Sequence, residues 1–450
     1  MRKVLIVTYW YPPKRTIGAL RPAKWAKYLP EFGWEPIVVT VEPHSDLYMR
    51  HGTLADELRQ GRVYRTRDLS LNELLYATRA LSPVRGFARA LSSAPENNPE
   101  GRLKSRNPLR RLGYLAYWVY KQFICFPDEA VPWLLEYPKI ERIAREERPE
   151  VILSSSLPNT SHLIASLLSR RLAIPWMADF RDLWSQNHVL PRNVLLRWIE
   201  VLLEKKTIEP AAGLITVSEP LKRQLEQLHG KPTYVIPNGF DPEDFPNEPP
   251  PSDPSGPLRI VYTGSVYPVH RDPRTLFAAL QMMLKEGKIR SRDVQIDFYG
   301  RRLNVVWSSL ESYPDVRPMV RFMGEVPYEE ALKAQVSADV LLLLEWTDPK
   351  AKGVYTGKVF EYLGAKRPIL SVGPTDGVIA ELLQETNAGV HVQHAEEILP
   401  WLHRWLDEKR AFGCPRWLGD PQAIGRYSRR EQARYLAEVL SSVAKGAFSA

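Results

Sequence analysis

The sequence has very few cysteines and no long apolar run. Only Cys125 and Cys414 occur among 450 residues, which excludes a disulfide framework or a zinc ribbon and makes a reducing cytoplasm the expected setting. No stretch reaches the roughly 18–20 apolar residues that cross a bilayer. The apolar run at the N-terminus is too short for a signal peptide and lacks a cleavage site. We therefore expect a cytoplasmic chain that is soluble or lies peripherally on the inner face of the cell membrane.

The signatures of several enzyme classes are also missing. The sequence has no Gly-x-x-x-x-Gly-Lys-Ser/Thr loop and no Gly-x-Gly-x-x-Gly after its first apolar run. These absences argue against a Walker-type nucleotide site and against a dinucleotide-dependent oxidoreductase. No group of His, Cys and Asp has the spacing of metal ligands. We therefore expect neither a metal ion nor a bound cofactor.

The positive charge is concentrated in one segment. The formal net charge is +9, and between Arg85 and Lys121 eight basic residues stand against two acidic ones. Aromatic and aliphatic residues follow directly, so Arg85–Phe126 suits an anionic membrane surface or an acidic lipid-linked substrate. A solvated loop that leads into a core helix is the alternative. No nucleic-acid motif accompanies the charge, so nucleic acid is not an expected partner.

Short apolar runs alternate with segments of helical spacing through most of the chain. The first half opens with "KVLIVTY" and "EPIVVTV", and the second with "LRIVYTG" and "VQIDFYG". This alternation predicts α/β domains with doubly wound parallel sheets. Residues 241–257, dense in proline and acidic residues, predict a linker. We therefore expect Rossmann-like domains over residues 1–240 and 258–424, with a ligand cleft at the carboxyl ends of their strands.

Candidate binding residues of the first domain follow its first strand. The run "YWYPPKRTIGALR" leads from this strand into a helix, and Gly18 lies at the helix entrance. A bare backbone there lets the phosphate or sugar of a donor approach the amides. Arg21 follows on the helix and is a candidate for binding an acceptor. A simple turn is the alternative for Gly18, and a solvent-facing charge is the alternative for Arg21.

Later loops of the first domain carry charged and polar groups. Asp179, Arg181 and Asp182 cluster after the strand "IPWMA", where two carboxylates around an arginine could orient a hydroxyl and shift each other's pKa. A structural ion-pair network is equally compatible with the pattern. His162, after "VILSSS", could bind a polyhydroxylated acceptor, although a histidine near a helix start is more often a capping or surface residue.

In the second domain, two loops suit an anion. Gly264 and Ser265 form an amide-rich turn after "LRIVYT", and Arg271 lies close by. The run "TGKVFEYLGAKRPIL" then places an amide-rich helix start and a cation together, with one carboxylate about a turn later. The amides, the cation and the hydroxyl suit a diphosphate, and the carboxylate can accept hydrogen bonds from two ribose hydroxyls. The residues concerned are Thr356, Gly357, Lys358 and Glu361.

Motifs along nearly the whole chain resemble glycosyltransferase family 4, a group of retaining, nucleotide-sugar-dependent enzymes of the GT-B fold. Each motif is weak alone, but together their order is specific. They are "YPPKRTIGALR", "PWMADFRDLWS", "LITVSEPLKRQL", "YVIPNGFDPEDF", "LRIVYTGSVYP", "GEVPYEE" and "GKVFEYLGAKRPIL".

The resemblance implies a donor held by the second domain, an acceptor held by the first, and no divalent metal. A final helix over about 425–447 would pack back on the first domain. By this resemblance Asp179, Arg181 and Asp182 would orient the acceptor and the sugar without any of them being an established base. The expected reaction moves a sugar to a hydroxyl of a glycan or a lipid-linked acceptor, in surface polysaccharide or glycolipid biosynthesis.

One departure from the family pattern concerns the donor sugar. The family commonly has two glutamates separated by seven residues. Glu361 matches the second, but Gly353 stands at the place of the first. This keeps two alternatives open: a non-catalytic scaffold that binds nucleotide sugars, and a nucleotide-sugar epimerase of the same architecture.

Overall fold

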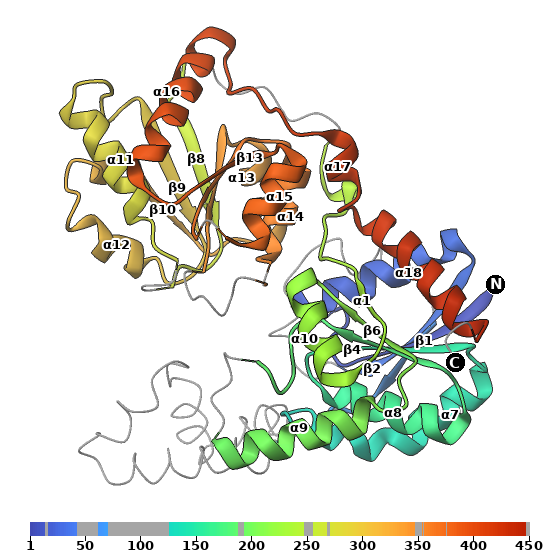
Figure 1. Cartoon of the computed structure of the whole chain (residues 1–450). Helices are drawn as coiled ribbons and strands as arrows, with labels where there is room; N and C mark the ends of the chain where they lie inside the picture. Colours follow the sequence, from blue (N-terminus) through green and yellow to red (C-terminus); the bar gives the residue numbers. More distant parts are fainter. Residues whose placement is uncertain are drawn as a thin grey trace, which may run out of the picture. The chain divides into compact units, whose positions relative to one another are not determined.

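The computed structural model describes residues 1–13, 17–42, 62–70, 126–187, 193–246, 255–267, 271–346, 353, 355–374 and 376–446. The chain divides into two compact units. The first comprises residues 1–217, 222–236 and 433–450, and the second comprises residues 218–221 and 237–432. Each unit contains its own parallel β-sheet with helices on its faces (Figure 1).

The described strands of the first unit form a parallel sheet in the order β3-β2-β1-β4-β5-β6-β7. These strands are β1 (Arg2–Thr8), β2 (Trp34–Val41), β3 (Arg62–Thr66), β4 (Val151–Ser155), β5 (Trp176–Phe180), β6 (Gly213–Thr216) and β7 (Thr233–Val235). The helices are α1 (Ile17–Tyr28), α7 (Tyr137–Glu147), α8 (Thr160–Leu172), α9 (Val194–Ile208) and α10 (Glu219–His229), with the short 3-10 helices η1 (Leu29–Phe32) and η5 (Val131–Glu136).

The core of the first unit forms around central strands that are buried at every position. All five residues of β4 and all five of β5 are buried, as expected for parallel strands covered on both faces. The final helix, α18 (Arg429–Ala444), contributes Ala433, Leu436 and Leu440 to the cluster that contains Val4 and Ile6 of β1. Residues from the two ends of the chain therefore share one core.

The described strands of the second unit form a parallel sheet in the order β10-β9-β8-β11-β12-β13. They are β8 (Leu258–Thr263), β9 (Val294–Tyr299), β10 (Val320–Gly324), β11 (Val340–Leu344), β12 (Ile369–Val372) and β13 (Gly389–Val392). The helices are α11 (Arg274–Lys285), α12 (Asn304–Leu310), α13 (Tyr328–Val336), α14 (Gly357–Ala365), α15 (Val378–Thr386), α16 (Ala395–Phe412) and α17 (Pro421–Gly425), with the 3-10 helices η6 (Pro242–Asp244) and η7 (Arg317–Met319).

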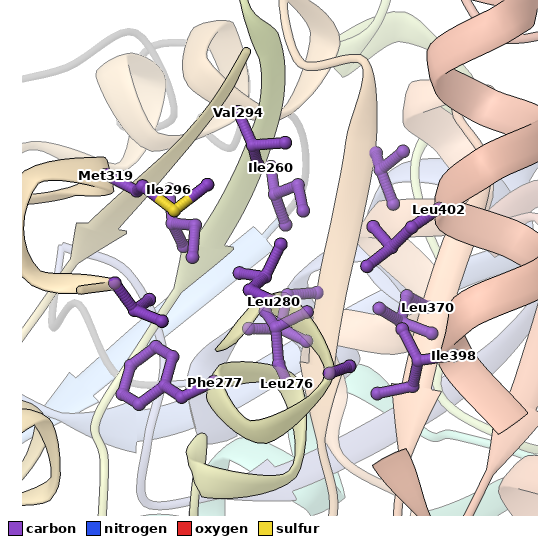
Figure 2. Packing of buried hydrophobic residues seen from close by; sticks show 14 of the residues in the cluster. Ile260, Leu276, Phe277, Leu280, Val294, Ile296, Met319, Leu370, Ile398 and Leu402 are labelled. Atoms are coloured by element: carbon purple, nitrogen blue, oxygen red, sulfur yellow. The ribbon is translucent and has the colours of Figure 1, made fainter. Parts of the chain in front are cut away.

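Alternate residues of the central strands in the second unit enter two separate cores. On β11, Leu342 and Leu344 join the cluster with α11 and α16, while Leu341 and Leu343 join the cluster with α14 and α15. Figure 2 shows the first cluster, with Leu280 of α11 and Leu402 of α16 packed against strand residues such as Ile260. Burial on both faces explains why β11 is a continuous apolar run.

The predicted fold class is confirmed: the chain forms two doubly wound parallel-sheet domains. Two local details differ from expectation. The edge strand β3 was not expected, because its sequence "RVYRT" is polar and only its last residue is buried. The segment predicted to be a linker, residues 241–257, contains the short 3-10 helix η6, at whose start the Asp241 carboxylate accepts a hydrogen bond from the Glu243 amide at 3.1 Å.

Candidate functional site

The first feature of the second unit is the start of α14. Thr356 lies in an extended conformation immediately before the helix, and its side chain caps none of the first-turn amides. The first amides of a helix have no partner within the helix, and they carry the positive end of its dipole. The residues "TGK" therefore present backbone donors and a cation at the same helix end, as the sequence predicts.

Lys358 has a buried amino group that makes no hydrogen bond within the described residues. Its Nζ is shielded from solvent and lies 4.0 Å from the centre of the Tyr262 ring. Burial lowers the pKa of Lys358 well below its usual value, and the nearby Arg271 guanidinium lowers it further. An unpaired buried ammonium is unfavourable unless an anion compensates it.

Gly264 explains how Lys358 fits. A Cβ placed on Gly264 would lie 2.6 Å from Lys358 Nζ, and the backbone at this glycine has φ +124°. Only glycine adopts this conformation without strain. The turn after β8 and the start of α14 therefore meet at the ammonium group, although they come from distant parts of the sequence.

Arg271 is the second cation beside this helix end. Its Nε is buried and has no hydrogen-bond partner in the part of the chain that the structure describes. Its guanidinium lies 5.5 Å from the Tyr267 ring and 5.8 Å from the Trp346 ring. The two aromatic rings contact each other edge-on at 5.3 Å. They hold the planar arginine on a surface where its remaining donors can meet a ligand.

Glu361 lies about one turn further along α14 and is positioned by a polar chain. Gln335 Nε2 donates to Glu361 Oε2 at 3.0 Å and to Thr263 Oγ1 at 3.0 Å. Burial raises the pKa of Glu361, while the bond from Gln335 and the charge of Lys358 act in the opposite direction. The carboxylate is thus fixed near the turn that follows β8.

The two remaining expected donor residues lie in the same loops. Gly357 is the first residue of α14, and Ser265 follows Gly264, with its carbonyl accepting a hydrogen bond from the Tyr262 hydroxyl at 2.8 Å. Gly353, at the place of the absent glutamate, is buried. It brings no carboxylate to this region.

In the first unit, Arg21 and Asp179 form a fully buried ion pair. Both side chains have no exposed surface, and Arg21 Nη2 lies 2.9 Å from Asp179 Oδ1. Ser155 Oγ donates to the other carboxylate oxygen at 2.7 Å, and the Arg21 guanidinium stacks on Trp25 at 4.2 Å. The solvent-facing alternative for Arg21 is therefore wrong. The geometry is that of the structural ion pair that was the alternative for Asp179.

Arg181 occupies a different position from its neighbour Asp179. Its Nη2 donates to the Leu157 carbonyl at 3.1 Å, and its Nε donates to the Ser156 carbonyl. A Cβ on Gly18 would lie 2.7 Å from Arg181 Nη1. The glycine at the start of α1 thus leaves room for a guanidinium, which gives a structural reason for Gly18. Asp182 is half-buried beside it and acts on Arg181 electrostatically.

His162 is buried and is neither a cap nor a surface residue, contrary to the alternative given for it. Its Nδ1 lies 2.7 Å from Ser154 Oγ, and its ring packs on Phe180 at 4.7 Å. Burial lowers the pKa of His162 to about 3, so the ring is neutral at pH 7. Its Nε2 is buried, and no described residue forms a hydrogen bond with it.

The structure thus brings together the residues of the second unit that are expected to bind the nucleotide-sugar donor. In contrast, Arg21, Asp179 and His162 are enclosed in the core of the first unit. Two further residues belong with the donor group: Tyr262 under the ammonium and Gln335 beside the carboxylate. Gln335 could have been found from the sequence, because it is a polar residue on the apolar face of α13. It is fully buried in the structure. The sequence offered no comparable signal for Tyr262. Within the described parts of the chain, no cluster of three metal-ligand side chains occurs.

Comparisons with known proteins agree with this architecture. Residues 84–244 match the profile of Glycosyltransferase Family 4, whereas no curated protein matches the chain by sequence. Among solved structures, a glycosyltransferase from Rickettsia africae shares 14% identity with a TM-score of 0.57, covering 99% of both chains. Anabaena HepE in complex with UDP shares 14% identity with a TM-score of 0.59, covering 98% of this chain and 100% of that one.

A third similar structure belongs to a protein that is named for a different activity. The N-terminal domain of Candida albicans trehalose-6-phosphate phosphatase shares 11% identity with a TM-score of 0.60, covering 98% of this chain and 97% of that one. At such identities these similarities show the fold and no shared chemistry. The chain thus has the GT-B fold, and its residues 84–244 are similar to those of family 4 glycosyltransferases.

Proposed function

We propose that the chain transfers a sugar from a nucleoside diphosphate sugar to a hydroxyl group of an acceptor. The observation that carries this proposal is the buried Lys358 side chain, whose Nζ has no hydrogen-bond partner among the described residues and lies beside Arg271 at the start of α14. Two neighbouring cations repel each other, and a diphosphate would relieve this repulsion and supply the missing acceptors.

The donor contacts follow from the same geometry. The diphosphate accepts hydrogen bonds from Lys358, Arg271 and the amides of Ser265 and Gly357, whereas the Gly264 amide already donates to the Tyr299 carbonyl at 2.8 Å. Glu361, fixed by Gln335, accepts hydrogen bonds from the ribose hydroxyls. Anabaena HepE has been crystallised with UDP and with UDP-glucose, which makes these two compounds the first ligands to test.

The same cations would stabilise the leaving group. When the bond between the sugar and the diphosphate breaks, negative charge develops on the phosphate oxygen. Fixed donors and a helix N-terminus at this position stabilise that charge. No divalent metal ion is then required for this step. Retention at the anomeric carbon is also part of the proposal, and it rests on the family resemblance.

The first unit would supply the acceptor site. Arg181 and Asp182 are half-buried at the carboxyl end of β5 and remain the candidates for orienting the acceptor hydroxyl. Arg21, Asp179 and His162 would support that region from within the core. Gly18 would keep the start of α1 open for Arg181.

We propose a glycan or a lipid-linked acceptor, made in a surface polysaccharide or glycolipid pathway on the cytoplasmic face of the membrane. The positively charged segment behind this proposal, Arg85–Phe126, lies outside the described residues except for its last residue. No helix in the described ranges combines the length and the apolar character needed to cross a membrane. Contact with the bilayer would then be peripheral.

The test is turnover of a radiolabelled nucleotide sugar panel, beginning with UDP-glucose, in the presence of lipid-linked and soluble glycan acceptors. Release of nucleoside diphosphate together with a labelled product supports the proposal, and Lys358→Ala should lose both. Binding without turnover across the panel would indicate a scaffold. A changed sugar configuration on the nucleotide would indicate an epimerase.

A further inference from the structure

The helix α9 differs from a normal surface helix, because it buries two carboxylates together with Leu196 and Ile208 and exposes large apolar side chains. Its inward face carries two carboxylates, Glu200 and Glu204, each 1% exposed. Its outward face carries large apolar side chains, with exposed fractions from 38% at Ile199 to 89% at Val194. A surface helix of a globular protein usually directs its apolar residues inward and its charges outward.

The inward carboxylates are held in specific contacts. Glu204 accepts a hydrogen bond from the Ser185 amide at 2.9 Å, and its other oxygen lies 3.2 Å from His229 Nε2. Glu200 lies 3.6 Å from Arg197 Nη1. On the same side, Ser166 of α8 donates to the Thr207 carbonyl at 2.7 Å. The orientation of the helix is therefore fixed, and a simple rotation would not hide the apolar face.

The outward residues form one continuous stripe. Val194, Trp198 and Leu202 follow at intervals of four positions, and Leu195 and Ile199 run beside them. Residues four apart lie on one face of a helix. Five of the thirteen large apolar side chains that are exposed in the described parts of the chain belong to this stripe. Such clustering marks an interaction surface.

The polar surroundings of the stripe favour a lipid surface as its partner. The exposed side chains of Lys205 and Lys206 follow in the next turn of α9, where they can reach phosphate headgroups while the apolar residues enter the acyl boundary. Tryptophan is enriched at this boundary. A stable protein dimer uses about 20–30 residues a side, and the stripe of five residues offers far fewer.

We infer that the outward face of α9 is a docking surface for an anionic phospholipid bilayer. The helix would lie in the plane of the membrane, with Val194, Leu195, Trp198, Ile199 and Leu202 in the interface and Lys205 and Lys206 on the headgroups. This inference does not depend on the nucleotide site or on the proposed activity. It also differs from the contribution of the segment Arg85–Phe126, because it rests on apolar insertion and not on charge alone.

The experiment is co-sedimentation of the full-length chain with vesicles of phosphatidylglycerol and phosphatidylethanolamine. The test variant is Leu195→Asn/Trp198→Gln/Leu202→Asn. A control, Leu167→Asn/Trp307→Gln/Leu418→Asn, changes the same residue types at exposed fractions of 46%, 45% and 48%, against 66%, 60% and 47% in the test variant. We expect at least tenfold weaker partitioning of the test variant, parent-like partitioning of the control, and an unchanged melting temperature in both.

Apolar insertion also predicts that high salt releases the test variant more readily than the parent, because the parent keeps its salt-independent contacts. A Leu195→Cys variant in a Cys125→Ser/Cys414→Ser background, labelled with an environment-sensitive dye, should show a blue-shifted emission when vesicles are added. Three results would overturn the inference: equal partitioning of all variants, a parent that dimerises through this face without binding vesicles, or a test variant that melts at lower temperature because another segment of the chain covers the stripe.

Discussion

The Lys358 ammonium lies where a side chain on Gly264 would begin. A Cβ on Gly264 would come within 2.6 Å of Lys358 Nζ, closer than real Cβ contacts come. The buried cation at the start of α14 therefore depends on a missing side chain in the turn after β8. This relationship joins two loops of the second unit at the proposed diphosphate site, and the first three predictions test that proposal.

Gly264→Ala should reduce both nucleotide affinity and stability. The new methyl group would displace Lys358 Nζ, and φ +124° would strain a residue with a Cβ by about 1–3 kcal/mol. Isothermal titration calorimetry with UDP and urea unfolding would measure the two effects. Gly287→Ala is the control, since its φ is also positive at +68° but nothing lies within 4 Å of its Cβ. Unchanged UDP affinity in Gly264→Ala would contradict the arrangement.

Binding of a nucleoside diphosphate should take up a proton. In the free protein the pKa of Lys358 lies well below 10.5, so between that lowered pKa and the usual value its amine is neutral. A bound diphosphate favours the ammonium and raises the pKa again. Because the complex then holds more protons than the free protein, UDP affinity should fall as pH rises through this window.

Calorimetry in two buffers of different ionisation enthalpy would detect the proton uptake. Lys358→Arg is the control, because a guanidinium stays charged and should bind without uptake. Lys358→Ala should weaken UDP binding by about 1.5–3 kcal/mol, the range for a hydrogen bond to a charged group. If UDP binds Lys358→Ala as tightly as the parent, the phosphate role of Lys358 is wrong.

Glu361→Ala should weaken binding of UDP more than binding of 2′-deoxy-UDP. The carboxylate can accept hydrogen bonds from two vicinal hydroxyls, and the deoxy compound lacks one of them. Gln335→Leu should show the same selectivity in weaker form, because Gln335 Nε2 holds Glu361 Oε2 at 3.0 Å without being needed for the phosphate. Competition calorimetry would compare the two ligands, and equal losses for both would remove the ribose assignment.

Asp179→Ala should destabilise the first unit by about 3–5 kcal/mol, because it would leave the Arg21 guanidinium buried without its partner. Arg21→Met/Asp179→Leu should recover part of this loss, since neither charge then remains buried. Chemical denaturation followed by far-UV circular dichroism would measure both variants. A stable Asp179→Ala protein that has lost only turnover would instead support a direct role in acceptor orientation.

The stability of the first unit should fall as the medium becomes acidic, partly through His162. The pKa of His162 is lowered to about 3 in the folded chain, from 6.5. The unfolded chain therefore binds a proton that the folded chain does not, and the stabilisation present above pH 6.5 is lost as pH falls towards 3. At pH 5 this amounts to about 2 kcal/mol for one group. Urea unfolding of His162→Asn should show a smaller decrease between pH 7 and pH 5 than the parent.

The sequence by itself determined the fold class and the loops of the second unit in which the donor residues lie. A buried parallel strand must be apolar on both faces, so runs such as "VLLLL" of β11 are visible locally, and their alternation with helical segments predicts the topology. The start of α14 was predictable for the same reason, because the amides of a helix end and the residues "TGK" are neighbours in the chain.

Only the tertiary structure decided which charged groups face a ligand and which are enclosed. Arg21 and Asp179 are 158 positions apart, and their pairing depends on the parallel register that places Ser155 beside Asp179. The exposure of one apolar face of α9 could not be predicted from the sequence either, because apolar residues occur on more than one side of this helix. Local periodicity reports burial along one element, whereas the partner of a charge depends on which distant elements pack against it.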